Sequence, residues 1–197
     1  PDTPALDLLG MVLGTGRASR LYRAVRERQL ASSISAHNYT PSEIGVFTIH
    51  AETTPDKTAA AAQAIWSQIA DVRDAGVGLH ELERARRVTE SRWIRRLESM
   101  EGQASHLAEW EALGDWRLGE HYLESLMAVQ ADGIRQVARK YLTDDRAGAA
   151  QGRRVERGAT AEDARRGGRL QRVDALAQPG REQLDDLCQR AYRSLLE

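Results

Sequence analysis

The sequence of 197 residues lacks several features that would assign it to particular classes of protein. Its one cysteine, Cys188, can form neither an internal disulfide nor a cysteine zinc cluster, so the fold must depend on its core. No run approaches the roughly 18 apolar residues that a membrane-spanning helix needs. The first residues, PDTPALDLLG, also lack the basic start and apolar run of a signal peptide. We therefore expect a soluble protein without membrane insertion.

An excess of charge of one sign is also absent. The 28 basic residues nearly cancel the 29 acidic ones and leave a formal net charge of -1. A weak overall field argues against nucleic acid as a partner. Apolar residues at 41% and charged residues at 29% are typical of a globular protein. The length suffices for one domain, or for one domain with an appendage.

Hydrophobic spacing predicts helices before and after one pair of strands along the sequence. Thr3 and Pro4 begin a helix that ends at the turn Gly14-Thr15-Gly16, because proline is tolerated at a helix start. Alternating β-formers on either side of Pro41 predict an antiparallel hairpin. The two predicted strands cover residues 31–40 and 45–53. The further predicted helices cover residues 19–28, 54–76, 79–113 with a bend at Gly102, 120–127 and 131–142.

This order of elements predicts the fold class and the organisation of the chain. Segregated helices and strands favour an α+β, two-layer domain with a small, mainly antiparallel sheet covered on one face by helices. We expect this domain to cover residues 1–150. Residues 151–180 are predicted to be an arginine-rich connecting segment, and residues 181–197 an amphipathic C-terminal helix that includes Cys188 on its apolar stripe.

The turn Gly14-Thr15-Gly16 invites a phosphate-binding interpretation, but the pattern argues against it. The third glycine of a dinucleotide fingerprint would be Ser19, and the turn follows a predicted helix rather than a strand. We interpret Gly14 and Gly16 as a structural turn that lets two helices meet at a sharp angle.

Two histidine motifs resemble zinc sites without completing them. A peptidase zinc site needs two histidines one helical turn apart and a glutamate that activates water. The first motif, His80-Glu81, has Arg84 where the second histidine belongs, and the second, which begins at His106, has Trp110 there. We therefore predict no zinc ligands and no catalytic residues in either motif.

Two other groups have side chains that could bind a metal ion or act as a nucleophile. His37, His50 and Glu52 lie on the two predicted strands and could face one another across the hairpin, but single strand histidines are usually polar surface. Cys188 has no histidine nearby in the sequence, which favours a packed thiol. We expect no metal and no cofactor in this chain.

Four segments in order carry a family resemblance. The first is the run at residues 5–58, in which GTGRASRLYRAVRER at 14–28 is the specific part. The others are GLHELERARR at 78–87, RLESMEGQASHLAEWEALGDW at 96–116 and VARKYLTDD at 137–145. From residue 1 to about residue 150 the sequence resembles the second, non-catalytic domain of insulinase/pitrilysin-type zinc metallopeptidases, a family related to the mitochondrial processing peptidases.

The resemblance implies a division of labour. In that family the first domain of a subunit carries H-x-x-E-H, the second has lost the zinc ligands, and two subunits or halves close into a chamber for peptides. It implies that this chain scaffolds an upstream catalytic domain of the same polypeptide, which would hold the zinc of a metalloendopeptidase. A second subunit of the same family and a peptide substrate are the further partners implied. The expected location is the bacterial cytoplasm or periplasm.

One pair of family residues can be carried over onto this sequence. In the zinc-facing halves of the family, an arginine and a nearby tyrosine hold the substrate carbonyl, which lowers the barrier to acyl cleavage. Arg26 matches the arginine, whereas the tyrosine position is occupied by Ser32. A serine hydroxyl is too short to reach what a tyrosine reaches. The resemblance therefore implies that Arg26 lacks its substrate-binding companion and that a partner subunit supplies the pair.

Two alternatives to this function remain open. The first is a purely structural assembly module of the same fold without proteolysis, which the absence of H-x-x-E-H upstream would favour. The second is an arginine-rich nucleic-acid binder, which salt-dependent retention on heparin would favour. The arginines that would carry the second are Arg153, Arg154, Arg157, Arg165 and Arg166.

Overall fold

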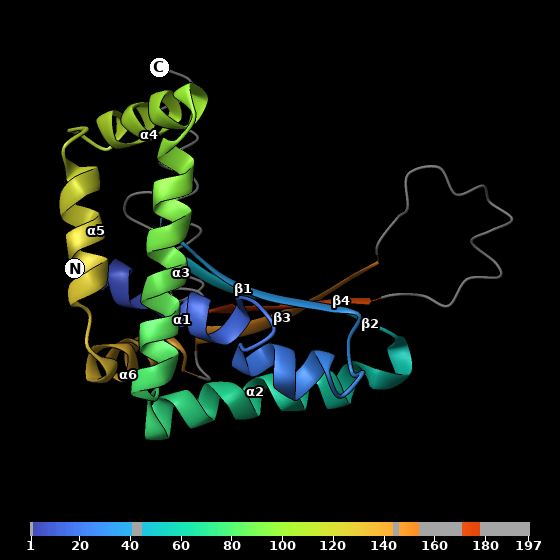
Figure 1. Cartoon of the computed structure of the whole chain (residues 1–197). Helices are drawn as coiled ribbons and strands as arrows, with labels where there is room; N and C mark the ends of the chain where they lie inside the picture. Colours follow the sequence, from blue (N-terminus) through green and yellow to red (C-terminus); the bar gives the residue numbers. More distant parts are fainter. Residues whose placement is uncertain (1, 41–44, 144–145, 154–170, 178–197) are drawn as a thin grey trace, which may run out of the picture.

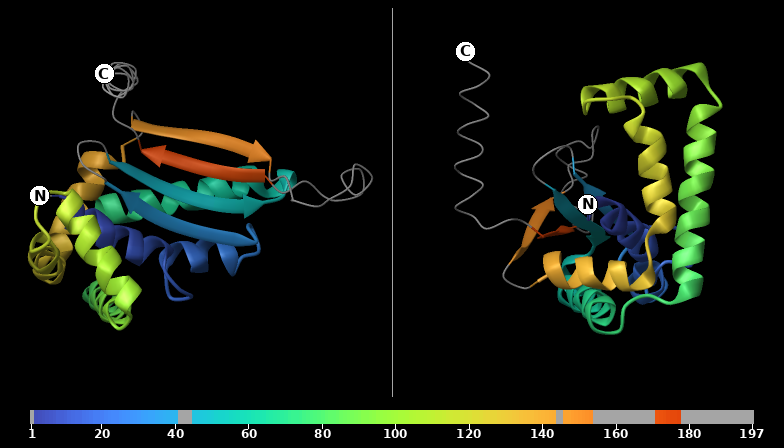
Figure 2. Two further views of the ribbon diagram at one scale, coloured as in Figure 1. Left: turned by 90° about the horizontal axis from the view of Figure 1, so that it is seen from above. Right: turned by 90° about the vertical axis from the view of Figure 1, so that its left-hand side faces the viewer.

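The computed structural model describes residues 2–40, 45–143, 146–153 and 171–177 and confirms the α+β class (Figure 1). Viewed from above, the helices lie on one side of an antiparallel sheet (Figure 2). The helices are α1 (Thr3–Gly14), η1 (Tyr22–Arg26), η2 (Pro55–Lys57), α2 (Thr58–Ala75), α3 (Leu79–Leu97), α4 (Met100–Ala112), α5 (Leu118–Ala128) and α6 (Ala131–Tyr141). The strands are β1 (Ser33–Tyr39), β2 (Val46–Thr53), β3 (Ala147–Arg153) and β4 (Gln171–Ala177).

The predicted hairpin is confirmed, and its two strands lie at one edge of the sheet. Strands β1 and β2 pair antiparallel, with Ala36 opposite Ile49 and His37 opposite Thr48. Along β2 every second residue is buried, beginning at Phe47 and ending at Thr53, while the residues between them are half-buried. This alternation is expected for a strand with one face against a helical layer.

Strands β3 and β4 were not predicted from the sequence. The sheet order is β1-β2-β4-β3, so β4 lies between β2 and β3 and pairs with both. Residues 171–177 therefore belong to the sheet, although they lie within the segment predicted to be a connection. The division of the chain at residue 150 stays a prediction. The predicted C-terminal helix, Cys188 and four of the five arginines of the nucleic-acid alternative lie outside the described residues.

The core is centred on α1, which is enclosed on several sides. Leu8, Leu9, Val12 and Leu13 have no exposed surface, and the helix contacts β1, α3, α5 and α6. A helix surrounded in this way is apolar around most of its circumference rather than along one stripe. Ile49 from the sheet belongs to the same cluster of buried side chains.

The prediction of one helix over residues 79–113 is wrong, because the structure has two, α3 and α4. Ser99 caps α4 by accepting a hydrogen bond from the Gly102 N–H (3.0 Å). A Cβ at Gly102 would lie 1.8 Å from the Arg96 carbonyl oxygen, so glycine permits the chain to turn back over the end of α3. The break therefore lies three residues before the predicted bend. The predicted helix at 19–28 also ends early, in the π-helical turn η1.

Candidate functional site

The glycine turn and the arginine position singled out from the sequence lie in one segment, from Gly14 at the end of α1 to Ser32. Gly14 ends α1 against the sheet: a Cβ there would lie 2.1 Å from the Ala36 nitrogen. Gly16 instead has a φ of 77° and open space around its Cα. The first glycine thus permits a close approach of two backbones, and the second permits a left-handed turn. Ser19, at the third position of the phosphate motif, is fully buried, and its hydroxyl donates to the Gly16 carbonyl (2.7 Å).

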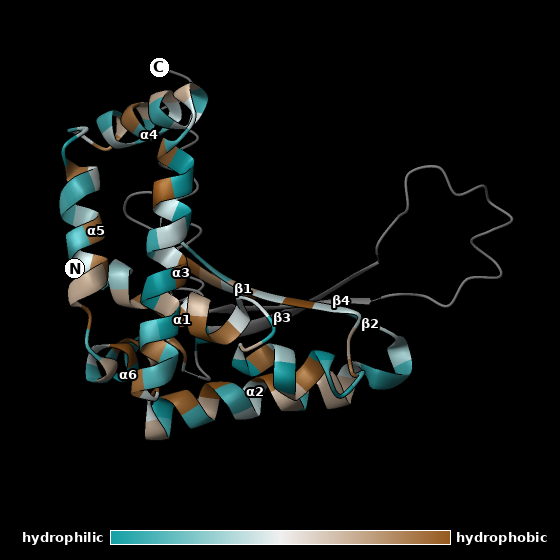
Figure 3. Ribbon diagram, in the orientation of Figure 1, coloured by the Kyte–Doolittle hydropathy of each residue, from teal (hydrophilic) through white to brown (hydrophobic). Residues whose placement is uncertain are grey.

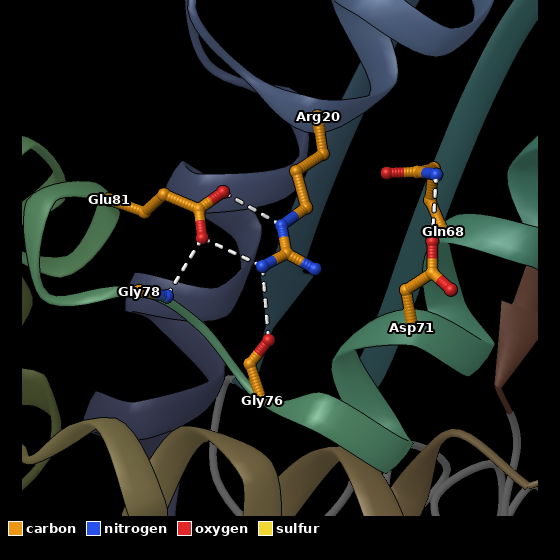
Figure 4. Close-up of polar contacts among 6 residues, drawn as sticks. All are labelled: Arg20, Gln68, Asp71, Gly76, Gly78 and Glu81. Atoms are coloured by element: carbon orange, nitrogen blue, oxygen red, sulfur yellow. Dashed lines mark hydrogen bonds and ion pairs between the residues drawn. The ribbon is translucent and has the colours of Figure 1, made fainter.

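An ion pair fixes this segment to the helical layer. Arg20 donates from Nε and Nη2 to the two carboxylate oxygens of Glu81, each at 2.7 Å, and Nη2 also donates to the Gly76 carbonyl (3.0 Å) (Figure 4). Glu81 in turn accepts a hydrogen bond from the Gly78 N–H at 2.9 Å. The segment after α1, the end of α2 and the start of α3 therefore meet at this ion pair.

The electrostatics of this pair follow from its geometry. The hydrogen bonds from Arg20 lower the pKa of Glu81 below its ordinary value, and Glu81 raises the pKa of Arg20. The two side chains keep only 19% and 30% of their surface exposed, so water screens the pair less than a surface pair. The position of Glu81 in the first turn of a helix was predicted, whereas its partner, 61 residues away in the sequence, was not.

Arg26 and Ser32 lie on either side of the turn that leads into β1. Arg26 is exposed on η1. The Ser32 hydroxyl donates to the Glu52 carbonyl at 3.1 Å, and its backbone N–H donates to the same oxygen at 2.7 Å. Ser32 is thus bound to the neighbouring strand, and the role of Arg26 in substrate binding stays a prediction. Gln29, between them, has a φ of 57°.

The two incomplete zinc motifs are engaged in structural contacts. In the first, Glu81 is held by Arg20, and Arg84 donates to the Thr15 carbonyl (3.0 Å). In the second, the ring of His106 packs edge-on against Trp93, with ring centres 4.9 Å apart, and 6.2 Å from Trp110. Burial lowers the pKa of His106, which has 8% of its surface exposed. These side chains do not fit a zinc ion.

The hairpin histidines are separated along the sheet. His37 lies opposite Thr48, and His50 lies opposite Ser35, two residues further along each strand. Glu52 lies opposite Ser33. Within residues 2–40, 45–143, 146–153 and 171–177, no group of three histidine, cysteine, aspartate or glutamate side chains could hold a metal ion. The alternative of a metal site on the hairpin therefore gains no support.

A half-buried carboxylate that was not singled out from the sequence, that of Asp7, lies beside β1. Asp7 accepts hydrogen bonds from the Tyr122 hydroxyl (2.5 Å) and the Asn38 amide (2.7 Å). Burial raises the pKa of Asp7 against the opposing effect of these two bonds, and burial also raises the pKa of Tyr122. The three side chains line a cleft of about 350 Å³ that also contacts Met11 and Trp93. A lone acid inside an apolar helix was the available signal, but its partners lie 31 and 115 residues away.

Known proteins are similar to this chain in sequence and in fold. Residues 1–89 match the family model described as the Peptidase M16 inactive domain. A Rickettsia felis protein named as an uncharacterized zinc protease is 29% identical over 135 residues, which are 68% of this chain and 32% of that protein. The chain thus spans about a third of the length of this curated relative.

Solved structures extend the likeness to three dimensions. The inactive peptidase domain of a Bordetella parapertussis protein has a TM-score of 0.67 and 26% identity, covering 73% of this chain and 79% of that one. A protease from Helicobacter pylori also gives a TM-score of 0.67 at 26% identity, but only 35% of its chain is covered. The chain therefore shares the fold of the solved inactive peptidase domain from Bordetella parapertussis.

Among the helices of the residues that the structure describes, none combines the length and the apolar character needed to cross a bilayer.

Proposed function

We propose that the chain is a catalytically inactive domain of a zinc-dependent endopeptidase, which scaffolds the catalytic domain and helps to form the peptide-binding chamber. The observation that carries the proposal is the loss of the second histidine in both near-motifs, at Arg84 and Trp110, within a fold shared with inactive peptidase domains. Such a domain contributes shape and surface to the enzyme and leaves the chemistry to another domain.

The wider organisation of the parent protein is part of this proposal. The name of the Rickettsia felis relative, and its length of about three times the matched region, support a zinc-binding catalytic domain elsewhere in the same polypeptide. A second subunit of the same family, which would close the chamber, and the kinship with mitochondrial processing peptidases stay predictions from the sequence resemblance. By itself the chain is not expected to cleave peptides.

The structural assembly module remains the alternative. It would keep this fold and the same inactive surfaces while the parent polypeptide had no hydrolytic activity. The coding sequence upstream of residue 1 separates the two, because H-x-x-E-H there supports the peptidase and its absence supports the assembly module.

Arg26 provides an experimental test of the division of labour. In the active parent enzyme, Arg26→Ala is expected to change turnover of an unstructured peptide by less than about threefold, because an arginine without its tyrosine companion is not poised on the scissile carbonyl. Arg28→Ala, on the same exposed segment, is the matched control. A loss of about a hundredfold in a normally folded Arg26→Ala enzyme, with Arg28→Ala unaffected, would place this domain in the catalytic apparatus.

A further inference from the structure

The end of the helical layer far from the sheet carries an unusual concentration of exposed apolar side chains. The upper end of α3, α4 and the start of α5 stand away from the sheet as an arm (Figures 1 and 2). We define the arm tip as residues 98–118. Eight large apolar side chains of the described residues are exposed, and five of them lie in the arm tip. They are Met100 (83% exposed), Leu107 (47%), Leu113 (52%), Trp116 (41%) and Leu118 (42%).

The exposure of these side chains is not explained by loose packing of α4. The inner side of α4 is already occupied, because His106 and Trp110 pack against Trp93 of α3 and Trp110 packs against Tyr122 of α5. A Cβ at Gly119 would lie 2.8 Å from both the His106 ring and the Trp110 ring, so α5 approaches α4 as closely as a glycine allows. Hydrophobic residues nevertheless recur along α4 (Figure 3), and Met100 and Leu107 of this helix are exposed. Helix α4 therefore packs against α3 and α5 through one side and exposes apolar side chains to solvent on another.

The outward side is hollowed and bordered by acids. Leu107, Ala108, Glu111 and Trp116 line an open, mainly apolar hollow of about 470 Å³, large enough for one or two apolar side chains. The arm tip contains one lysine or arginine, Arg117, whose guanidinium lies over the Trp116 ring (4.6 Å) and pairs with Asp115 (3.5 Å). Its acids are Glu98, Glu101, Glu109, Glu111 and Asp115, and Glu109 is paired with Arg96 (2.6 Å), so acids still outnumber basic residues at this surface. A contiguous apolar patch with a polar border typically marks an interaction site, and an acidic border selects a partner whose own border is basic.

Relatives of this chain carry a large further region in the same polypeptide. This chain spans only 32% of the Rickettsia felis relative and 35% of the Helicobacter pylori protease, so most of each polypeptide lies outside the matched region. A tethered domain reaches a surface at an effective concentration that a free partner does not match. We propose that the arm tip is the surface on which the catalytic domain of the parent polypeptide docks, with an apolar side chain in the Leu107–Trp116 hollow and basic side chains around it. This inference rests on the proposed function.

Hydrogen exchange of the isolated chain and of the parent polypeptide tests this docking. Amides of residues 100–118 are expected to exchange more slowly in the parent, by about tenfold or more, because a docked surface must open before it exchanges. In the parent, Leu107→Glu should return these amides to the rate of the isolated chain, and Glu111→Lys should reduce the protection. Leu79→Glu is the matched control, since Leu79 is 72% exposed at the opposite end of α3.

Several outcomes would overturn the docking. Equal exchange of the arm tip in the isolated chain and in the parent is one, and protection that survives Leu107→Glu is another. Protection that rises with the concentration of the isolated chain would identify a second copy as the occupant instead. The zinc content and peptidase activity of the same parent samples test the proposed function separately. A protected arm tip in a zinc-free parent would support the docking while contradicting the peptidase.

Discussion

Replacing Gly14 by valine is expected to lower the free energy of unfolding by about 3 kcal/mol or more, because overpacking against an immobile backbone exceeds the usual cost of an added methyl group. A Cβ at residue 14 would lie 2.1 Å from the nitrogen and 2.8 Å from the Cα of Ala36. Neither atom can move aside without shifting β1 relative to α1, the helix at the centre of the core. Even Gly14→Ala should therefore be strongly destabilising in urea unfolding.

Gly16 is the matched comparison for this experiment. It has a φ of 77° and no atom within 4 Å of the position a Cβ would take. Gly16→Ala should therefore lower the free energy of unfolding by only about 1 to 2 kcal/mol, the cost of holding one residue with a Cβ in the left-handed conformation. Gly16→Asn should cost less, since asparagine tolerates that conformation. Equal losses for Gly14→Ala and Gly16→Ala would mean that the close approach of α1 to β1 is unimportant for stability.

Removal of the Arg20 guanidinium should be the next most damaging change. Arg20→Met is expected to cost about 2 to 3 kcal/mol, because it leaves a partly buried carboxylate without the charged donor that compensates its burial. The Gly76 carbonyl loses its donor as well. The double variant Arg20→Met/Glu81→Gln should lose less than the sum of the two single variants, since no carboxylate then remains unpaired.

An exposed pair in the same chain serves as the control. Arg117 and Asp115 lie 3.5 Å apart with 63% and 47% of their side chains exposed, so Arg117→Met should change stability by less than about 0.5 kcal/mol. Additive losses for Arg20→Met and Glu81→Gln, or an Arg20→Met effect as small as that of Arg117→Met, would contradict a stabilising role for the pair.

The pair also predicts a dependence on pH. The folded-state pKa of Glu81 lies below its ordinary value of 4.5, so the unfolded chain binds the proton more readily. The stabilisation is therefore present above about pH 4.5 and is lost as the pH falls through the lower, folded-state pKa. Between these values the wild-type chain should lose more stability than Glu81→Gln, in which residue 81 does not titrate.

Local signals explain how much of the fold was predictable. Pro4 at a helix start, the alternation along residues 46–53 and Gly76 at a helix end each act within a few residues, and the structure confirms these elements. The break between α3 and α4 was missed because the apolar spacing continues across it. A serine cap and a close approach at Gly102 outweigh that spacing.

The undetected features depend on pairings between distant residues. Strand β4 has a composition that resembles a connection, and it takes its place only by pairing with β2 and β3. Likewise, the partners of Asp7 and Arg20 lie dozens of residues away and leave no local pattern. The zinc near-motifs show the converse. Because Arg84 and Trp110 cannot ligate zinc, the sequence by itself argues against both sites, and the absence of zinc from this chain stays a prediction.

The division of labour between this chain and its parent polypeptide is tested most directly by counting metal ions. After dialysis against micromolar zinc, the isolated chain is expected to retain well under about 0.1 zinc ion per molecule, since neither near-motif supplies two histidines with an activating glutamate. The parent polypeptide treated in the same way should retain about one zinc ion. One tightly held zinc ion per isolated chain, lost on His37→Ala or His50→Ala, would contradict the assignment of this domain as the inactive one.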